Sequence, residues 1–284
     1  MISQPDNSDR HGSLFHYTTA GGLLGILRDQ ELWATDVRYL NDGQEVIYAR
    51  AQMIEALDAI HNPFGDVQHP VDRGIDMRGL TWDEYRYNIR QYIDTMPFPT
   101  YVACLCDSGD LLSQWRAYGN QQGYVIEFRR EWLEQALDGL HTYEPSCGLR
   151  AVRYGLEDAV NVVGTAVEQV QSDTNLAHWA VAARYMALRL VAVLATVKHP
   201  GFHEEREWRL VVAYVSSGQD PVKFRSVPTG IVPYVVVPFP REAVVSVRVG
   251  PGQDIPARRD AVRRLLHRFD YVAEVASSET PYRT

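Results

Sequence analysis

The sequence predicts an α+β fold, built mainly on antiparallel strands, with a helical insertion. Short apolar strands and helices follow one another along the 284 residues, but without the regular strand–helix–strand order of a parallel sheet. Neither GxGxxG nor GxxxxGK[ST] follows a predicted strand, so the common nucleotide-binding loops are missing from the sequence. Residues 1–12 are polar and predict a disordered leader, and residues 13–284 are expected to form a single domain.

The first half of the chain alternates strand and helix signals. Thr19 precedes a group of leucines and an isoleucine at helical spacing, so it is the expected cap of a short helix. The Asn41-Asp42-Gly43 turn offers a second cap. The expected elements are a strand at Leu14–Thr18, the capped helix around Leu23–Leu27, a strand at Glu31–Thr35, a helix ending near His61, a Pro/Gly-rich loop at 62–80 and an amphipathic helix at Trp82–Ile93.

The second half carries more strand signals. Residues from about 156 to 197 are rich in Ala, Val and Leu, which predicts two packed helices as an insertion. Around it the expected elements are a strand at Thr100–Cys106, a helix at Asp110–Tyr118, a strand at Gly123–Phe128, a helix at Glu131–Leu140, and strands at 149–154, 207–215, 222–227, 232–237 and 243–249, then a helix at 255–268 and a strand at 271–276.

Composition excludes several classes of protein. The formal net charge of -8 argues against a broad basic face for nucleic acid, although a local arginine patch is compatible with it. No apolar run reaches the length of a membrane helix, and the polar start is unlike a signal peptide, which predicts a cytoplasmic protein without membrane contact. The three cysteines, Cys104, Cys106 and Cys147, are expected to be free thiols.

The first candidate group is His16, Tyr17 and Thr18, at the end of a predicted strand. His16 and Thr18 can hydrogen-bond sugar hydroxyls, and the following helix N-terminus offers backbone N–H groups to a phosphate. By spacing alone, a histidine at a strand end is more often a capping residue than a ligand.

The second candidate group follows the strand Thr100–Cys106. Cys104 and Cys106 should point to the same face, and Trp115, Arg116 and Tyr118 could wall a cleft for an aromatic ring. The alternative is an ordinary core with Trp115 buried.

The third candidate group is the acidic run Glu204, Glu205 and Glu207 at a strand entrance. If the chain is extended there, Glu205 and Glu207 share one face, and two carboxylates can stabilise an oxocarbenium-like sugar. Surface salt bridges are the simpler interpretation.

Other chemistries have less support in the sequence. A cysteine nucleophile would need His16 or His199 beside it, and a zinc site would need a CxxC spacing that the chain lacks. No GxSxG is present for a serine nucleophile. The sequence predicts no metal.

The order of these groups resembles a bacterial family, domain of unknown function 2971. The stretches that carry the resemblance are Phe15–Thr18, Leu32–Thr35, Tyr39–Asp42, Leu111–Gly119, Lys198 with Phe202, Glu205–Arg209, Val249–Pro251 and Ser278–Arg283. That family in turn looks like a distant branch of the ADP-ribosyltransferase superfamily, whose fold is two small perpendicular sheets with NAD between them.

This resemblance implies roles for the candidate residues. His16 matches the first motif, the strand Ala103–Cys106 the second and Glu207 the catalytic glutamate, with Glu205 as in a Glu-x-Glu motif. It departs at Cys104 and Cys106, which stand where hydroxyl residues are usual. NAD is then the expected co-substrate, with Tyr17, Trp115 or Tyr118 as stacking walls, Arg116 on the pyrophosphate, and Glu204 or Glu205 as alternatives to Glu207.

Three functions follow as expectations. The first is transfer of ADP-ribose from NAD to a protein or nucleic acid, as in a toxin or defence effector. The second is the same sugar chemistry used for NAD hydrolysis or for removal of an RNA 2'-phosphate. The third is a nucleotide-binding module without catalysis. The helical insertion is open to interpretation as a lid, an acceptor platform or a homodimer surface.

Overall fold

The computed structural model describes residues 12–40, 43–60, 82–95, 99–118, 122–138, 147–172, 189–190, 193–213, 221–228 and 230–280. They form an α+β fold with a mixed, mostly antiparallel sheet, as the sequence predicts. The predicted leader up to residue 11, the loop at 62–80 and most of the second insertion helix lie outside the described residues.

The main sheet has ten strands within the described ranges, in the order β12-β11-β4-β1-β3-β2-β10-β9, with β8 and β5 extending from β3. All pairs are antiparallel except β11 with β12. The strands are β1 (Ser13–Thr18), β2 (Glu31–Asp36), β3 (Thr100–Cys106), β4 (Tyr124–Arg129), β5 (Gly148–Ala151), β8 (Glu207–Ala213), β9 (Lys223–Val227), β10 (Gly230–Pro238), β11 (Val244–Val249) and β12 (Glu274–Ser277).

The sheet divides at β3. One edge of β3 pairs with β8 along its whole length. The other edge pairs with β2 near its start, at Tyr101 and Val102, and with β1 at its end, at Cys106. The resemblance implies two separate sheets. The structure has instead a single connected sheet, in which β1 and β2 pair with the same edge of β3.

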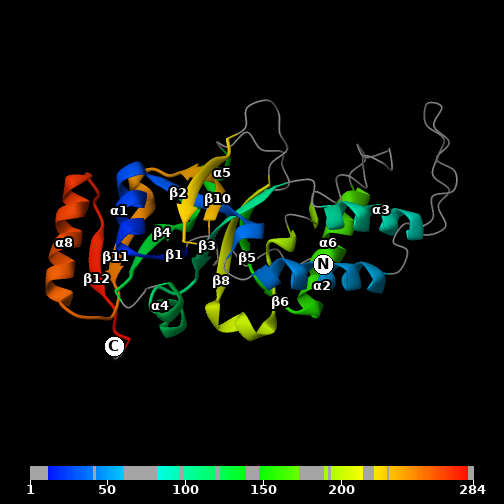
Figure 1. The fold of residues 1–284 in the computed structure, drawn as a ribbon, viewed down its shortest axis with the longest axis horizontal. Helices are drawn as coiled ribbons and strands as arrows, with labels where there is room; N and C mark the ends of the chain where they lie inside the picture. Colours follow the sequence, from blue (N-terminus) through cyan, green and yellow to red (C-terminus); the bar gives the residue numbers. More distant parts are fainter. Residues whose placement is uncertain are drawn as a thin grey trace.

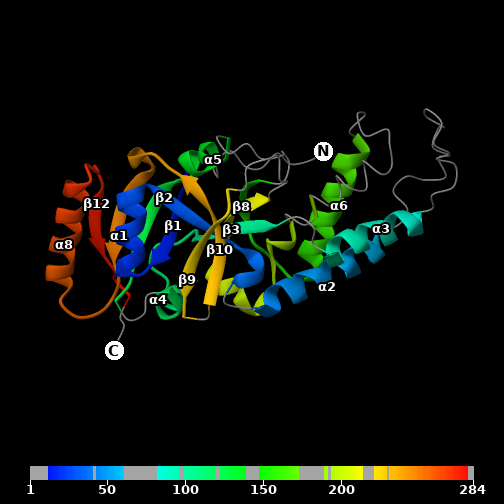
Figure 2. The same ribbon diagram turned by 45° about the horizontal axis from the view of Figure 1, so that its top comes forward.

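Helices cover the sheet and form a second layer beside it. Figures 1 and 2 show α1 and α8 at one end of the sheet and α2, α3 and α6 together at the other. The helices are α1 (Ala20–Asp29), α2 (Gly43–Ala59), α3 (Trp82–Thr95), α4 (Leu112–Tyr118), α5 (Arg130–Asp138), α6 (Leu156–Ser172) and α8 (Ile255–Arg268), with short 3-10 turns η2 (Val37–Tyr39), η3 (Pro200–Glu205) and η4 (Arg241–Ala243).

Two main hydrophobic cores result. The sheet core includes Leu14, Leu27 and Leu210, whereas Met53 and Ile89 belong to a separate core among the helices. The predicted insertion is thus only part of the helical layer, because α6 packs with α2 and α3 from the first half of the chain.

Strand β3 is apolar on both faces because it lies between cores. Tyr101, Ala103 and Leu105 face the sheet core, whereas Val102 and Cys104 face a smaller cluster on the other side. This alternation of faces follows from the two-residue period of a strand. The apolar run that predicted β3 is continuous because both faces of the strand are buried.

The structure corrects four element boundaries. The predicted strand at 149–154 is divided into β5 and β6 (Arg153–Tyr154), and the predicted helix ends before β7 (Val197–Lys198), which pairs with β6. The approach to β8 is the 3-10 turn η3, not an extended segment. Residues 271–273 precede the last strand instead of belonging to it.

Candidate functional site

A cavity of about 70 Å³ lies where the sheet divides. Its lining combines residues from β1, β3, α4 and the η3–β8 junction. Six of the predicted site residues belong to it: His16, Tyr17, Cys104, Tyr118, Glu205 and Glu207. Phe15, Leu105 and Gln114 complete the described lining. Segments up to about 190 residues apart in the chain therefore meet at one point.

His16 spans the gap between the diverging strands. Its Nδ1 donates to the backbone oxygen of Cys104 at 2.9 Å. In the neutral ring the single proton is therefore on Nδ1, and Nε2 carries none. Burial lowers the pKa of His16 more than this hydrogen bond raises it, and the positive charge of Arg225 lowers it further. His16 is therefore a neutral imidazole whose Nε2 can accept a hydrogen bond.

Glu207 begins β8 and is 7% exposed. Its Oε1 accepts from Arg209 Nε at 2.7 Å, and its Oε2 accepts from Arg209 Nη2 at 3.1 Å and from Lys198 Nζ at 3.2 Å. Glu207 and Arg209 share one face of β8 because they are two residues apart.

Two further carboxylates join this ionic cluster, which we define as Glu45, Lys198, Glu205, Glu207 and Arg209. Lys198 Nζ lies 2.6 Å from Glu205 Oε2 and 2.8 Å from Glu45 Oε1. Arg209 also donates to Glu45 Oε2 at 2.7 Å and to the backbone oxygen of Ala195 at 2.7 Å. Three carboxylates thus surround two cations.

The cluster sets the charge states of its members. Burial raises the pKa of Glu207, but the charge of Arg209, its hydrogen bonds and the charge of Lys198 outweigh burial and lower that pKa to about 2. Burial lowers the pKa of Lys198, whereas Glu207, Glu205 and Glu45 raise it above its ordinary value. Both groups are charged at neutral pH.

Glu205 is placed differently from the prediction. It ends the turn η3, and Arg206 adopts a left-handed conformation (φ 48°) before β8 starts. Glu205 and Glu207 consequently do not share a strand face, yet both carboxylates reach Lys198. Glu205 has a more exposed side chain, at 18%, and Glu204 is exposed outside the cavity lining.

The cysteines are poor nucleophiles in this setting. Burial raises the pKa of Cys104, and the charge of Glu207 raises it further. Burial also raises the pKa of Cys106, to about 11, and its Sγ donates to the backbone oxygen of Glu205 at 3.2 Å. His199 Nδ1 accepts from the N–H of Gly201 instead of contacting a thiol. Within the described ranges, no group of three or more side chains is placed to hold a metal ion.

Several predicted ligand residues have structural roles. Trp115 is 3% exposed, packs edge-on against Tyr17 and donates from Nε1 to Asp110 at 2.7 Å. The Tyr17 hydroxyl donates to Ser108 O at 3.0 Å and accepts from Leu111 N at 2.8 Å. Neither Trp115, Thr18 nor Arg116 belongs to the cavity lining, and Arg116 is exposed on α4.

Sequence reasoning missed Lys198 as the centre of the cluster. The chain has only two lysines, at 198 and 223, among 28 cationic residues, but because Lys223 is exposed on β9 this scarcity does not by itself single out Lys198. It also missed Arg225, which is half-buried, donates to Thr35 Oγ1 at 2.8 Å and lies over the Trp33 ring. The positive charge of Arg225 lowers the pKa of His16, although Arg225 is not part of the cavity lining.

A family model matches part of the chain. A family model described as "Protein of unknown function (DUF2971)" matches residues 114–210, a stretch that includes Tyr118, Lys198, Glu205 and Glu207 but not His16. Neither a curated protein nor a solved structure matches the chain.

The helices were also compared with the length and apolarity of membrane spans. In the part of the chain that the structure describes, none is long and apolar enough to cross a bilayer.

Proposed function

We propose that this cavity receives the nicotinamide-ribose end of NAD and that the protein transfers ADP-ribose to a protein or nucleic acid acceptor. The observation that supports this proposal best is the convergence of His16, Tyr118, Glu205 and Glu207 around one cavity. These residues come from three segments that the sequence singles out independently.

The size of the cavity limits what it can enclose. Its 70 Å³ is well below the roughly 300–1,000 Å³ of pockets that enclose drug-sized ligands. Part of the nicotinamide-ribose end would enter this cavity, and the rest of the dinucleotide would lie outside it. Arg225 is half-buried and its charge acts on His16, so we assign the pyrophosphate contact to Arg225 in place of Arg116.

The reaction breaks the bond between C1' of the ribose and the ring nitrogen of nicotinamide. The bonding electrons leave with nicotinamide, and positive charge develops on the ribose. A nucleophile of the acceptor then forms a bond to C1' and loses its proton. A carboxylate that hydrogen-bonds the 2'-hydroxyl stabilises this charge most where water is excluded.

Glu205 is the carboxylate best suited to that contact. It lines the cavity, it is more exposed than Glu207, and its Oε2 is held by Lys198. Glu207 is engaged through both oxygens, so its role is to fix Lys198 and Arg209. His16 accepts a hydrogen bond from a ribose hydroxyl through Nε2. Burial raises the pKa of Tyr118, so its hydroxyl stays protonated and donates.

A second candidate is a nucleotide-binding module without catalysis. The observation that favours it is the engagement of Glu207, the residue that the resemblance equates with the catalytic glutamate, by two buried cations. In this case Glu205 would contact the ligand without accelerating any reaction.

Release of nicotinamide from NAD by the purified chain tests the proposal. We expect Glu205→Gln to lower the rate by about 100-fold or more, the usual effect of removing one group that stabilises a transition state. Glu204→Gln is the matched control, because Glu204 is adjacent in sequence but exposed outside the cavity, and its rate should equal that of the unaltered protein.

The acceptor is followed by mass spectrometry of added protein and RNA. ADP-ribose attached to either indicates a transferase, and free ADP-ribose alone indicates a hydrolase. NAD binding without nicotinamide release would support the module. Equal rates for Glu205→Gln and Glu204→Gln would contradict the role of Glu205.

A further inference from the structure

Two aromatic rings and an arginine lie together on one face of the sheet, on the neighbouring strands β2, β10 and β9 that Figure 2 shows side by side. The centres of the Trp33 and Tyr234 rings are 4.6 Å apart, and the ring planes are inclined by 32°. The guanidinium carbon of Arg225 lies 5.5 Å from the centre of the Trp33 ring and 5.9 Å from that of Tyr234. We call these three side chains the aromatic platform.

Trp33 is the exposed member of the aromatic platform. It is 39% exposed, whereas Tyr234 is 8% exposed and Arg225 is half-buried. The contacts with Tyr234 and Arg225 restrict the Trp33 ring, so its exposed surface is held in place. A flat aromatic surface that is fixed and open to solvent is suited to stacking against another flat ring.

The charge of Arg225 has no counter-ion among the described residues. Its Nη2 donates to Thr35 Oγ1 at 2.8 Å, a neutral acceptor, and no carboxylate of the described ranges pairs with it. Its Nε is buried without a hydrogen-bond partner in the same ranges. A half-buried guanidinium group with neutral partners alone favours an anion, and a phosphate matches its paired N–H donors.

Strand register places the aromatic platform on the face of the sheet that holds the 70 Å³ cavity. Thr35 is paired with Val102 in β3 and with Tyr234 in β10, so these side chains share a face. Val102 shares that face with Cys104, which lines the cavity. Trp33 is two residues before Thr35, and because β2 and β3 are antiparallel it lies on the side of Thr35 toward Cys104. The aromatic platform therefore borders the fork at which β2 leaves β3.

We propose that Trp33 stacks on the adenine ring of NAD while Arg225 contacts the adjoining pyrophosphate. This inference rests on the proposed function for the choice of NAD, and it extends that function to the adenosine end, which the 70 Å³ cavity is too small to enclose. Every nucleobase has a flat face that stacks on an aromatic side chain. The sequence lacks the common nucleotide-binding loops, so the adenosine end needs a different support such as this one.

Calorimetric titration of the full chain with ADP tests the proposal. We expect saturable binding that Trp33→Leu weakens about tenfold or more, the usual effect of removing one base–aromatic stack. Trp33→Phe keeps an aromatic ring and should retain most of the affinity. Nicotinamide mononucleotide lacks the adenosine, so it should bind Trp33→Leu and the unaltered protein equally. Equal weakening of both probes would show a distorted fork instead of a lost stack and would overturn the proposal.

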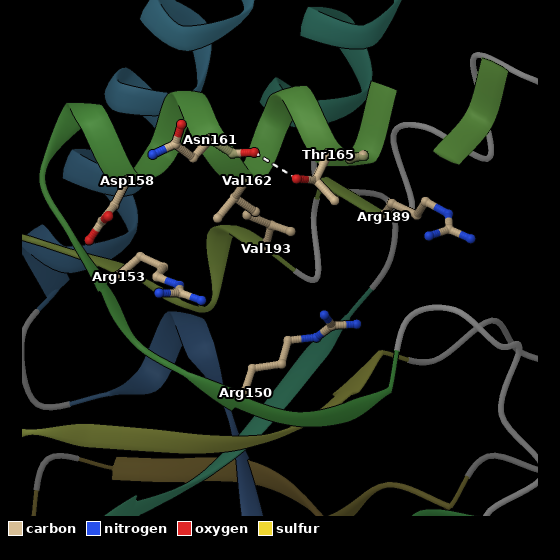
Figure 3. Close-up of a pocket in the computed structure, with 9 residues that line it drawn as sticks. Arg150, Arg153, Asp158, Asn161, Val162, Thr165, Arg189 and Val193 are labelled. Atoms are coloured by element: carbon tan, nitrogen blue, oxygen red, sulfur yellow. Dashed lines mark hydrogen bonds between the residues drawn. The ribbon is translucent and has the colours of Figure 1, made fainter. Parts of the chain in front are cut away.

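Two variants act as controls. Phe224→Leu removes an exposed aromatic ring of β9 from the opposite face of the sheet. Arg153→Gln removes an exposed arginine that lines a separate cavity of about 310 Å³ between β5, β6 and α6, which Figure 3 shows. Both should bind ADP as the unaltered protein does. Equal ADP affinity of Trp33→Leu and Phe224→Leu, or loss of binding in Arg153→Gln, would overturn the proposal.

Nicotinamide release separates this proposal from the proposed function. If the unaltered protein releases nicotinamide but Trp33→Leu binds ADP normally, the aromatic platform is not the adenine site, and the proposed function stands. If Trp33→Leu loses ADP affinity but no nicotinamide is released, the aromatic platform is supported as part of a nucleotide-binding module, and the proposed transfer is contradicted. Absence of saturable ADP binding would overturn the assignment of the aromatic platform.

Discussion

Lys198 is the residue that organises the candidate site. It is 2% exposed and contacts three carboxylates, from α2, η3 and β8. Its ammonium group also lies 4.6 Å from the centre of the Phe202 ring. Removing it would leave Glu45, Glu205 and Glu207 with Arg209 as the remaining cation of the ionic cluster, which is a strong electrostatic penalty in a buried setting.

We therefore predict that Lys198→Met lowers the free energy of unfolding by about 3–5 kcal/mol, as is typical when one partner of a buried ionic group is removed. Lys223→Met is the matched control, because the chain's other lysine is exposed on β9 and its loss should change stability by about 0.5 kcal/mol or less. Urea denaturation measures both. Equal stability of the two variants would show that the cluster contributes little.

At the scale of elements, the junction between η3 and β8 positions the two carboxylates. Arg206 has φ of 48° and donates its N–H to His203 O at 3.2 Å, while its carbonyl accepts from Asp107 N at 3.2 Å. This left-handed residue separates the turn from the strand, so that Glu205 ends the turn and Glu207 begins the strand. Its side chain forms an ion pair with Asp107 at 2.7 Å.

Comparison of Arg206→Gly with Arg206→Val isolates the backbone conformation, because both changes remove the ion pair with Asp107. Glycine adopts positive φ freely, whereas a β-branched residue is strained there. We expect the glycine variant to be more stable by about 1–2 kcal/mol in urea denaturation. A valine variant that is as stable as the glycine variant would show that the junction has relaxed.

At the scale of the whole molecule, the ionic cluster joins two hydrophobic cores. Glu45 comes from α2 in the helical layer, and Arg209 comes from β8 in the sheet. Their 2.7 Å contact and that of Arg209 with Ala195 O connect the layers at a buried point. We expect this connection to make the layers unfold together.

Met53→Ala and Leu210→Ala test this cooperativity, since both side chains are fully buried, one in each core. Each should cost about 2–5 kcal/mol. For both variants, far-UV circular dichroism and tryptophan fluorescence should follow one transition in urea. Separate transitions in the Met53→Ala variant would mean that the helical layer unfolds independently of the sheet.

Local patterns in the sequence predicted most of the elements. β3 was predicted with its observed bounds, because a short apolar run with prolines before it and Asp107, Ser108 and Gly109 after it is typical of a buried strand. Helix α1 was predicted from its cap, and Thr19 Oγ1 indeed accepts from Gly22 N at 3.2 Å. Boundaries failed where tertiary contacts decide them, as at Val197, which a helical pattern includes but which pairs with Arg153 in the structure.

The sequence by itself determined the α+β class, the predicted free cysteines and the segments that carry His16, Glu205 and Glu207, because strand and helix periods and residue chemistry are local properties. Only the tertiary structure decided which of these groups meet and in which charge state. The neutral state of His16 and the core position of Trp115 follow from burial, and His16 hydrogen-bonds Cys104, 88 residues away in the chain. Arg209, which engages Glu207, is itself held by Glu45, 164 residues away. No periodicity in the sequence encodes such distances, since they arise only when β1, β3, β8 and α2 pack together.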